Sequence, residues 1–136
     1  MSKVEGRRSK VPKALVLLLG SLVAASPAAI GASRPANEQA RIDWLLKEVG
    51  GSKAVFIRNG KEYDAEKAVS HLKSKLFFAG SRVQTARQFI TGVASHSEES
   101  GKPYEIRFPD GNQLKLETWL LERLAVYEKG DKAAKN

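Results

Sequence analysis

The spacing of apolar residues switches between helical and strand periods along the chain, which predicts a mixed fold. A first helix is expected after Asn37 as its cap, and Gly50-Gly51 should end it. Its apolar residues recur at i, i+3, i+4 and i+7, as one helix face requires: Ile42, Leu45, Leu46 and Val49. Asp64 should cap a second helix that Gly80-Ser81 breaks. Its apolar side comprises Ala65, Ala68, Val69, Leu72 and Leu76.

Two further helices are predicted in the second half of the chain. Thr85 and Gln88 have the spacing of a capping box, in which each side chain bonds a backbone amide at the helix start. The apolar residues that follow are Phe89, Ile90, Val93 and Ala94. The final helix is expected over about 117–127 and presents Trp119, Leu120, Leu124 and Tyr127. Residues 128–136 carry many charges and no apolar period, so we expect a flexible tail.

Strand patterns occur in two places, and each contains a turn signal. Residues 54–58 are rich in Val, Ile and Phe and run into Asn59-Gly60, a dipeptide typical of tight hairpins, with a return through Tyr63. Residues 104–108 alternate apolar and polar, and a Pro-Asp-Gly turn leads on to Leu114 and Leu116. Between the third helix and this hairpin, residues 95–103 read as a loop. We therefore predict one α+β domain over 33–127, with about four amphipathic helices packed on a small antiparallel sheet (hairpin strands near 54–63 and 104–116).

The first 32 residues have the order of a signal peptide: a basic head, an apolar run from Ala14 to Ala25, and small residues that end at Ala32. Cleavage after Ala32 is expected, with Ala28 as the alternative site. A membrane anchor is the competing interpretation, but the run is only 12 residues, whereas a span needs about 20. Arg7-Arg8 is not followed by the apolar residues of a twin-arginine signal. We predict a periplasmic or secreted protein without a membrane span after cleavage.

Charge and cysteine content narrow the function classes. The chain has 23 Lys and Arg against 15 Asp and Glu, a net +8. Five of these bases and one acid lie in the first 32 residues, which leaves 18 against 14, or about +4. Without a stripe of like charge, nucleic acid is disfavoured as a partner. With no cysteine and only two histidines, no disulfide, metal or other cofactor is predicted.

Several blocks fall in the order seen in one family. They are Phe56-Ile57-Arg58-Asn59-Gly60 with Tyr63, Ala68-Val69-Ser70-His71-Leu72 with Lys75-Leu76, Thr85-Ala86 with Gln88-Phe89-Ile90, Val93-Ala94-Ser95 with Ser97, and Ser100-Gly101-Lys102-Pro103-Tyr104. Over about 38–124, the chain resembles the YfeK-like family of uncharacterised exported proteobacterial proteins, a domain of unknown function. The resemblance implies export and a single domain, and it lends no activity, cofactor or partner.

His71 and Lys75 lie four residues apart and so share one face of the second helix. They could form a small anion site with Arg58 or Tyr63 if the Asn59 turn folds over that helix. The interpretation we favour is a histidine at the edge of the apolar stripe, hydrogen-bonded to a nearby loop. Likewise, Arg58 and Asn59 could present a guanidinium and a turn amide to an anion, although an exposed hairpin turn explains them more simply.

The loop 95–103 contains every residue type of a serine hydrolase triad, because His96 lies among Ser95, Ser100 and two glutamates. Neighbours in sequence rarely converge into a triad, and no Gly-x-Ser-x-Gly elbow is present, so a solvated loop is favoured. Lys102 follows Ser-Gly but does not complete a phosphate-binding loop. The candidate ligand or partner contacts are Arg58, Asn59, Tyr63, His71, Lys75, Ser95, His96, Ser100, Lys102 and Tyr104, and no catalytic residue is assigned.

The sequence thus favours a non-enzymatic binding or accessory protein of the cell envelope. Its partner would be an unidentified envelope component, whether protein, glycan or small ligand. One alternative is a hydrolase or other enzyme that uses His71 or His96, which requires a pocket holding a histidine beside a hydroxyl or carboxylate. The second alternative is a weak polyanion binder, whose affinity would fall steeply with salt.

Overall fold

Two hairpins lie side by side and form one antiparallel sheet in the order β2-β1-β3-β4. The computed structural model describes residues 33–135, so the predicted signal peptide lies outside the described residues. The strands are β1 (Val55–Arg58), β2 (Lys61–Tyr63), β3 (Glu105–Arg107) and β4 (Gln113–Lys115). At the junction of the two hairpins, Phe56 pairs with Ile106 and Ile57 with Glu105.

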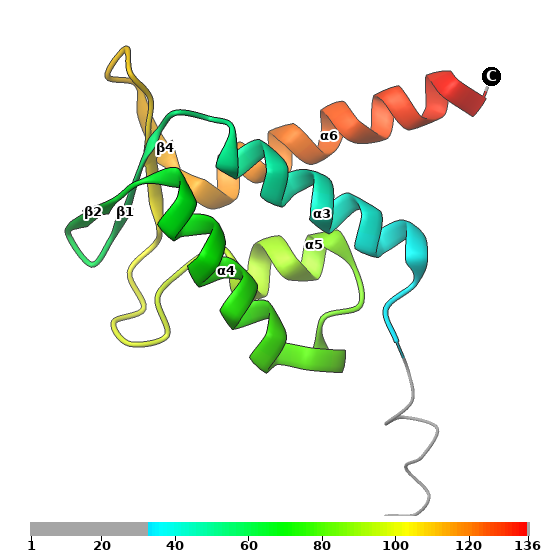
Figure 1. Cartoon of the computed structure of the whole chain (residues 1–136), viewed down its shortest axis with the longest axis horizontal. Coiled ribbons are helices and arrows are strands. Elements are labelled where there is room, and N and C mark those ends of the chain that lie inside the picture. Colours follow the sequence, from blue (N-terminus) through cyan, green and yellow to red (C-terminus); the bar gives the residue numbers. More distant parts are fainter. Residues whose placement is uncertain (1–32, 136) are drawn as a thin grey trace, which may run out of the picture. The chain divides into compact units, whose positions relative to one another are not determined.

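Helices make up the rest of the fold (Figure 1). They are α3 (Ala36–Gly50), α4 (Ala65–Ala79), the short η3 (Gly80–Arg82), α5 (Ala86–Gln88), η4 (Phe89–Val93) and α6 (Leu116–Lys135). The strands gather at one side of the helices, where α6 packs on β3 and β4 and α4 packs on β1. The predicted α+β class, with four helices on a small antiparallel sheet, is confirmed.

One core is shared by the sheet and the helices. Ile42 of α3, Phe89 of η4, Ile106 of β3 and Leu120 of α6 have no exposed surface. All four apolar residues predicted for the first helix are buried as well. Each large side chain buried in this way contributes about 1.5–3 kcal/mol of hydrophobic stabilisation. The core therefore draws on every layer, which fixes the hairpins against α4 and α6.

Three local sequence signals, a helix cap, a hairpin turn and a capping box, set where the first hairpin, α4 and α5 begin or turn. Asp64 caps α4 by accepting a hydrogen bond from the backbone amide of Lys67 over 2.8 Å. Asn59 and Gly60 have φ angles of 52° and 79°, so both central residues of the first turn are left-handed, as a type I′ hairpin turn requires. The capping box of Thr85 and Gln88 is present. These three sequence predictions are confirmed.

Several predicted boundaries are wrong. The first helix begins at Ala36 after Pro35, without a side-chain cap, because the fixed φ of proline already suits a helix start; Asn37 lies inside the helix. Leu116 begins α6 instead of ending a strand, and α6 continues past Tyr127 to Lys135. Residues 128–135 include alanine, lysine and glutamate, which favour helix, and Lys135 pairs with Asp131 at 3.4 Å.

The third helix also differs from a regular α-helix. After one turn it widens into the π-helix η4, where the backbone amide of Ala94 bonds the carbonyl of Phe89 five residues earlier. Phe89, Ile90 and Val93 are all buried in this segment. The wider turn directs three large side chains from five consecutive residues into the core, a geometry often found near functional sites.

None of the helices in residues 33–135 is both long and apolar enough to cross a membrane.

Candidate functional site

A pocket of about 140 Å³ lies where the first hairpin packs over α4. Its inner wall is apolar and is formed by Phe56 of β1, Ala68 and Leu72 of α4, and Leu116 at the start of α6. Ile57 and Lys67 complete the lining outside the polar rim. An apolar cavity with a few polar groups at its mouth is the usual form of a small-ligand site.

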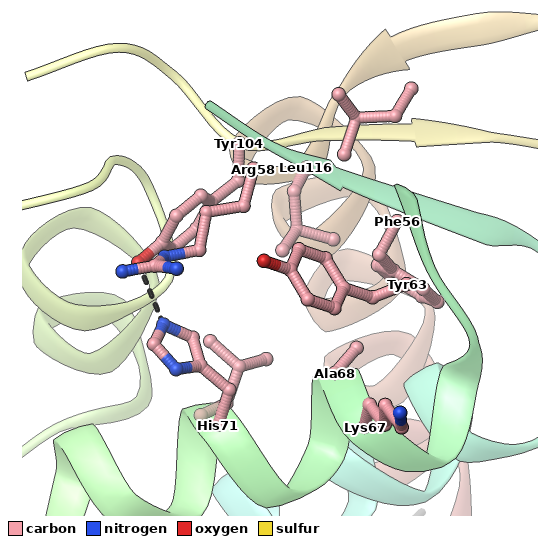
Figure 2. Close-up of a pocket in the computed structure, with 10 residues that line it drawn as sticks. Phe56, Arg58, Tyr63, Lys67, Ala68, His71, Tyr104 and Leu116 are labelled. Atoms are coloured by element: carbon pink, nitrogen blue, oxygen red, sulfur yellow. Dashed lines mark hydrogen bonds between the residues drawn. The ribbon is translucent and has the colours of Figure 1, made fainter. Parts of the chain in front are cut away.

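Four polar side chains converge at the rim of this pocket: Arg58, Tyr63, His71 and Tyr104. Figure 2 shows the Tyr63 hydroxyl pointing across the pocket toward the Arg58 guanidinium, with His71 and Tyr104 beside that guanidinium. They come from the end of β1, the end of β2, the middle of α4 and the residue before β3. The fold therefore brings together Arg58, Tyr63 and His71 of the predicted anion site and adds Tyr104, whereas Lys75, the other member of that prediction, does not line the pocket.

Tyr104 is the centre of a hydrogen-bond network. Its hydroxyl lies 3.1 Å from Nε2 of His71 and accepts a hydrogen bond from Nζ of Lys75 over 3.0 Å. Lys75 also donates to the backbone carbonyl of His96 over 2.9 Å and lies 4.9 Å from the centre of the Tyr104 ring. Because an ammonium group can only donate, the hydroxyl proton of Tyr104 is free to serve either His71 or a bound ligand.

Backbone bonds hold Tyr104 in place. Its amide donates to the carbonyl of Ser95 over 3.0 Å, and its carbonyl accepts from the amide of Leu116 over 2.9 Å. The side chain is 5% exposed. Tyr104 is thus fixed between the loop 95–103 and the start of α6, and its hydroxyl is the part that meets the pocket.

Arg58 is the least satisfied polar group of the site. Its Nε atom is buried and has no hydrogen-bond partner in the part of the chain that the structure describes. An ion pair joins its Nη2 atom to Glu99 at 3.7 Å, but the Glu99 side chain is 73% exposed. The neighbouring Tyr63 hydroxyl raises the pKa of the Arg58 guanidinium above its usual range, and the effect outweighs that of burial. Arg58 therefore keeps a permanent positive charge at the rim.

His71 lies in positive surroundings. Burial lowers the pKa of its imidazole, and the positive charges of Arg58 and Lys75 lower it further. The ring also packs edge-on against Tyr104, with 5.9 Å between ring centres. A lowered pKa means that His71 is neutral at pH 7, so it can donate or accept a hydrogen bond without adding charge.

Asn59 ties the hairpin turn to the loop 95–103. Its amide nitrogen donates to the Ser97 hydroxyl over 3.1 Å and to Glu99 over 3.2 Å, and its amide oxygen accepts from the Ser100 hydroxyl. Ser97 is fully buried, although the sequence marked it only as part of a family block. These bonds hold the turn that follows Arg58 against the loop that precedes Tyr104.

The remaining candidates lie apart from the pocket. The Ser95 hydroxyl lies 2.6 Å from the carbonyl of Thr91 and 2.7 Å from Nδ1 of His96. The partners of Ser95 thus place it at the end of the third helix, outside the residues that line the pocket. Lys102 is exposed, and its backbone amide donates to the Ser100 hydroxyl over 3.2 Å. Within residues 33–135, no carboxylate hydrogen-bonds to His96, and no group of three His, Asp or Glu side chains could hold a metal ion.

Two features had no counterpart in the sequence predictions. Lys67, four residues before His71 on α4, lines the pocket; the same i, i+4 spacing that linked His71 to Lys75 could have revealed it. At the other end of α4, Phe77 and Phe78 are 78% and 75% exposed. Two adjacent phenylalanines directly after Leu76, the last residue of the apolar stripe, are the sequence signal for that surface.

Fold and site together define a small α+β domain with one hairpin packed over a helix and a partly polar pocket between them. The chain belongs to the family of unknown function (DUF5329), whose model matches residues 36–128. This confirms the resemblance stated from the sequence blocks.

The chain is also similar to a bacterial protein that is itself uncharacterised. The chain is 47% identical over 70 residues to the uncharacterized protein YfeK of Salmonella typhimurium (strain LT2). The match covers 51% of this chain and 58% of that protein's length. No solved structure matches the chain.

Proposed function

We propose that the chain is an exported, non-enzymatic protein of the cell envelope that binds a ligand in the pocket between the first hairpin and α4. The observation that carries the binding role is the convergence of Arg58, Tyr63, His71 and Tyr104 on an apolar cavity of about 140 Å³. An apolar pocket with several convergent polar groups is the usual form of a ligand site.

The composition of the pocket favours binding over catalysis. Among the ten residues that line it, the polar groups are arginine, lysine, histidine and tyrosine. All of these groups can donate hydrogen bonds, and Arg58 and Lys67 carry positive charge, whereas hydrolases commonly use a nucleophile such as serine or cysteine, or a carboxylate pair. The Ser95 hydroxyl, the nearest candidate nucleophile to His96, lies beside the Thr91 carbonyl at a helix end. We therefore expect binding without turnover.

Export is supported by the order of basic, apolar and small residues in the first 32 positions. We propose cleavage after Ala32, with the processed protein in the periplasm or secreted. Mass spectrometry of the protein recovered from cell fractions tests this step. A chain in the periplasmic fraction that begins at Ser33 supports the proposal, and a chain retained in the cytoplasm with residues 1–32 attached overturns it.

Binding is tested by a thermal-shift screen of the protein expressed from the full chain. The probes are muropeptides, lipid headgroups, sugars, short peptides and divalent metals. A ligand at one hundred times its Kd stabilises the folded state by about 2.7 kcal/mol, which raises the Tm of a domain of this size by several degrees. A pocket ligand should produce this shift in the native protein.

A matched pair of variants separates pocket binding from surface binding. Ala68→Leu fills the cavity from α4 and should abolish the shift. Ala125→Leu makes the same change on the exposed face of α6, where the residue does not line the pocket, and should preserve the shift. A ligand whose shift survives Ala68→Leu does not bind in the pocket, which would contradict the proposal for that ligand.

One geometric observation favours a second candidate, an enzyme that uses His71. The imidazole lies 3.1 Å from the Tyr104 hydroxyl at the rim of a pocket, which is the arrangement that the catalytic alternative requires. Such a pair could transfer a proton. His71→Gln separates the two functions, because it should remove turnover of any substrate found while retaining part of the thermal shift. If no pocket ligand is turned over, the binding role stands alone.

A further inference from the structure

Arg58 indicates the chemistry of the pocket's ligand. Its Nε–H is buried and has no acceptor among residues 33–135. A buried donor without an acceptor costs about 1–3 kcal/mol, so an acceptor supplied by a ligand would remove a penalty that the free protein carries. The ion pair with Glu99 is long, at 3.7 Å, and mostly in water, so a ligand can take its place at little cost.

The electrostatic surroundings favour an anionic ligand group. Arg58, Lys67 and Lys75 lie in or directly beside the pocket. Two acidic side chains face these cations, Glu98 at 3.5 Å from Lys75 and Glu99 beside Arg58, and both are about 70% exposed. The field inside the rim is therefore positive, which agrees with the lowered pKa of His71.

The size and lining of the inner cavity limit the rest of the ligand. Phe56, Ala68, Leu72 and Leu116 offer no hydrogen bonds at its inner wall, so hydroxyl-rich groups such as sugars would lose their water there. The volume of about 140 Å³ is close to the ~150 Å³ of an apolar cavity that accommodates benzene. A hydrocarbon group of about six carbons fits this space.

We infer that the pocket binds a carboxylate attached to a hydrocarbon group of about six carbon atoms. Arg58 would hold the carboxylate, with the hydroxyls of Tyr63 and Tyr104 as further donors, and the apolar group would lie over Ala68 and Leu72. This inference rests on the proposed binding function and names its ligand class. A free carboxylic acid and the C-terminal residue of a peptide share this chemistry.

A carboxylate with a hydrocarbon group fits better than a phosphate ester because the inner wall of the pocket is apolar. The guanidinium fork of Arg58 can hold two oxygens of either group in a bidentate arrangement. The organic groups that a phosphate carries in nucleotides and sugars are polar, however, and would lose their water against this wall. The apolar inner wall therefore selects the acid with a hydrocarbon group.

Isothermal titration of the protein expressed from the full chain tests the inference. The free acids are phenylacetate and 4-methylpentanoate, and each is paired with its uncharged amide. The peptide arm uses Gly-Gly-Leu and Gly-Gly-Leu-amide. We expect each acid that binds to do so at least tenfold more tightly than its amide. Binding of the free acids, of the peptide, or of both supports the inference and identifies the source.

Variants connect the measured affinity to Arg58. Arg58→Gln should lower the affinity for the acids at least tenfold and leave the affinity for the amides unchanged. Arg58→Lys keeps the positive charge and should retain part of the affinity for the acids. Arg107→Gln is the matched control, because Arg107 also lies on a strand and pairs with a glutamate, Glu62 at 2.8 Å, but does not line the pocket. Circular dichroism checks that each variant is folded.

The outcomes distinguish the inference from the proposed function. Equal affinity for acids and amides, or no binding of any acid, overturns the carboxylate inference. The binding function still stands if another ligand class gives a thermal shift that Ala68→Leu abolishes. If no class gives such a shift, both fail.

Discussion

The side-chain amide of Asn59 donates a hydrogen bond to the buried hydroxyl of Ser97 over 3.1 Å, joining the first hairpin turn to the loop before β3. Replacing Asn59 tests this connection. Asn59→Gly keeps the left-handed turn but loses the side-chain bonds, so it should lower the free energy of unfolding by about 1–2 kcal/mol. Asn59→Ala loses the bonds and also strains the backbone, at a further cost of about 1 kcal/mol.

Urea unfolding of the two Asn59 variants measures these costs. The difference in the free energy of unfolding between the two variants measures the cost of the φ of 52° at this position. The difference between Asn59→Gly and the native protein measures the contribution of the bonds to the loop 95–103. Equal stability of Asn59→Gly and the native protein would show that the turn does not depend on the loop 95–103.

His71 should make the stability depend on pH. Burial, Arg58 and Lys75 lower the pKa of His71 in the folded state below the ordinary value of 6.5. The unfolded chain therefore binds more protons near and below that value, and the free energy of unfolding falls as the pH drops through it. Above it the imidazole is neutral in both states, and the stability due to this group is complete.

Melting curves between about pH 7.5 and pH 5.5 measure this effect. The Tm of the native protein should fall as the pH drops over this range. The Tm of His71→Gln should fall by less, because this variant lacks the titrating imidazole. A steeper fall in the variant would contradict the assigned direction of the pKa shift.

Lys75 should stabilise the fold through its hydrogen bonds and not through its ion pair. Its side chain is 15% exposed and bonds both the Tyr104 hydroxyl and the His96 carbonyl. Lys75→Met removes both bonds and should cost about 1–3 kcal/mol. Glu98→Gln removes only the exposed ion pair and should change the free energy of unfolding by less than about 0.5 kcal/mol. Similar losses in the two variants would assign the stability to the ion pair.

Phe77 and Phe78 should contribute little to folding and much to surface hydrophobicity. Their rings stack edge to face, with 5.5 Å between centres, on the exposed side of α4. Phe77→Ser with Phe78→Ser should shift the free energy of unfolding by about 0.5 kcal/mol or less per site and reduce the binding of a hydrophobic dye. Phe89→Ala, at a fully buried position, is the contrasting control and should cost about 3–5 kcal/mol.

The local elements could be predicted from the sequence because their signals are local. The Asp64 cap, the Asn59-Gly60 turn and the box of Thr85 with Gln88 each act within four residues. Helix ends were less predictable: Gly130 is a residue type that often ends a helix, yet α6 continues through it to Lys135. The π-helix η4 departs from the 3.6-residue period of an α-helix, so apolar periodicity alone does not indicate it.

The candidate site was predictable only in part, because it depends on contacts between distant segments. The shared face of His71 and Lys75 follows from helix geometry, but their neighbour Tyr104 comes from the residue before β3. The packing of the Asn59 turn over α4 could be stated only as a condition. No local pattern indicates that β1 pairs with β3, so the meeting of Arg58 with Tyr104 was not predicted. The unsatisfied Nε atom of Arg58 follows from the packed structure alone.

The strand order β2-β1-β3-β4 also has a kinetic consequence. Each hairpin closes a short loop and can form within microseconds, but the pairing of β1 with β3 encloses α4 and the third helix. Such distant pairing is slow because a long loop must be ordered first. Arg58, at the end of β1, and Tyr104, directly before β3, lie where these two strands pair. A ligand that bridges them would act after the rate-limiting step of folding, so it should prolong the lifetime of the native state and leave the refolding rate almost unchanged.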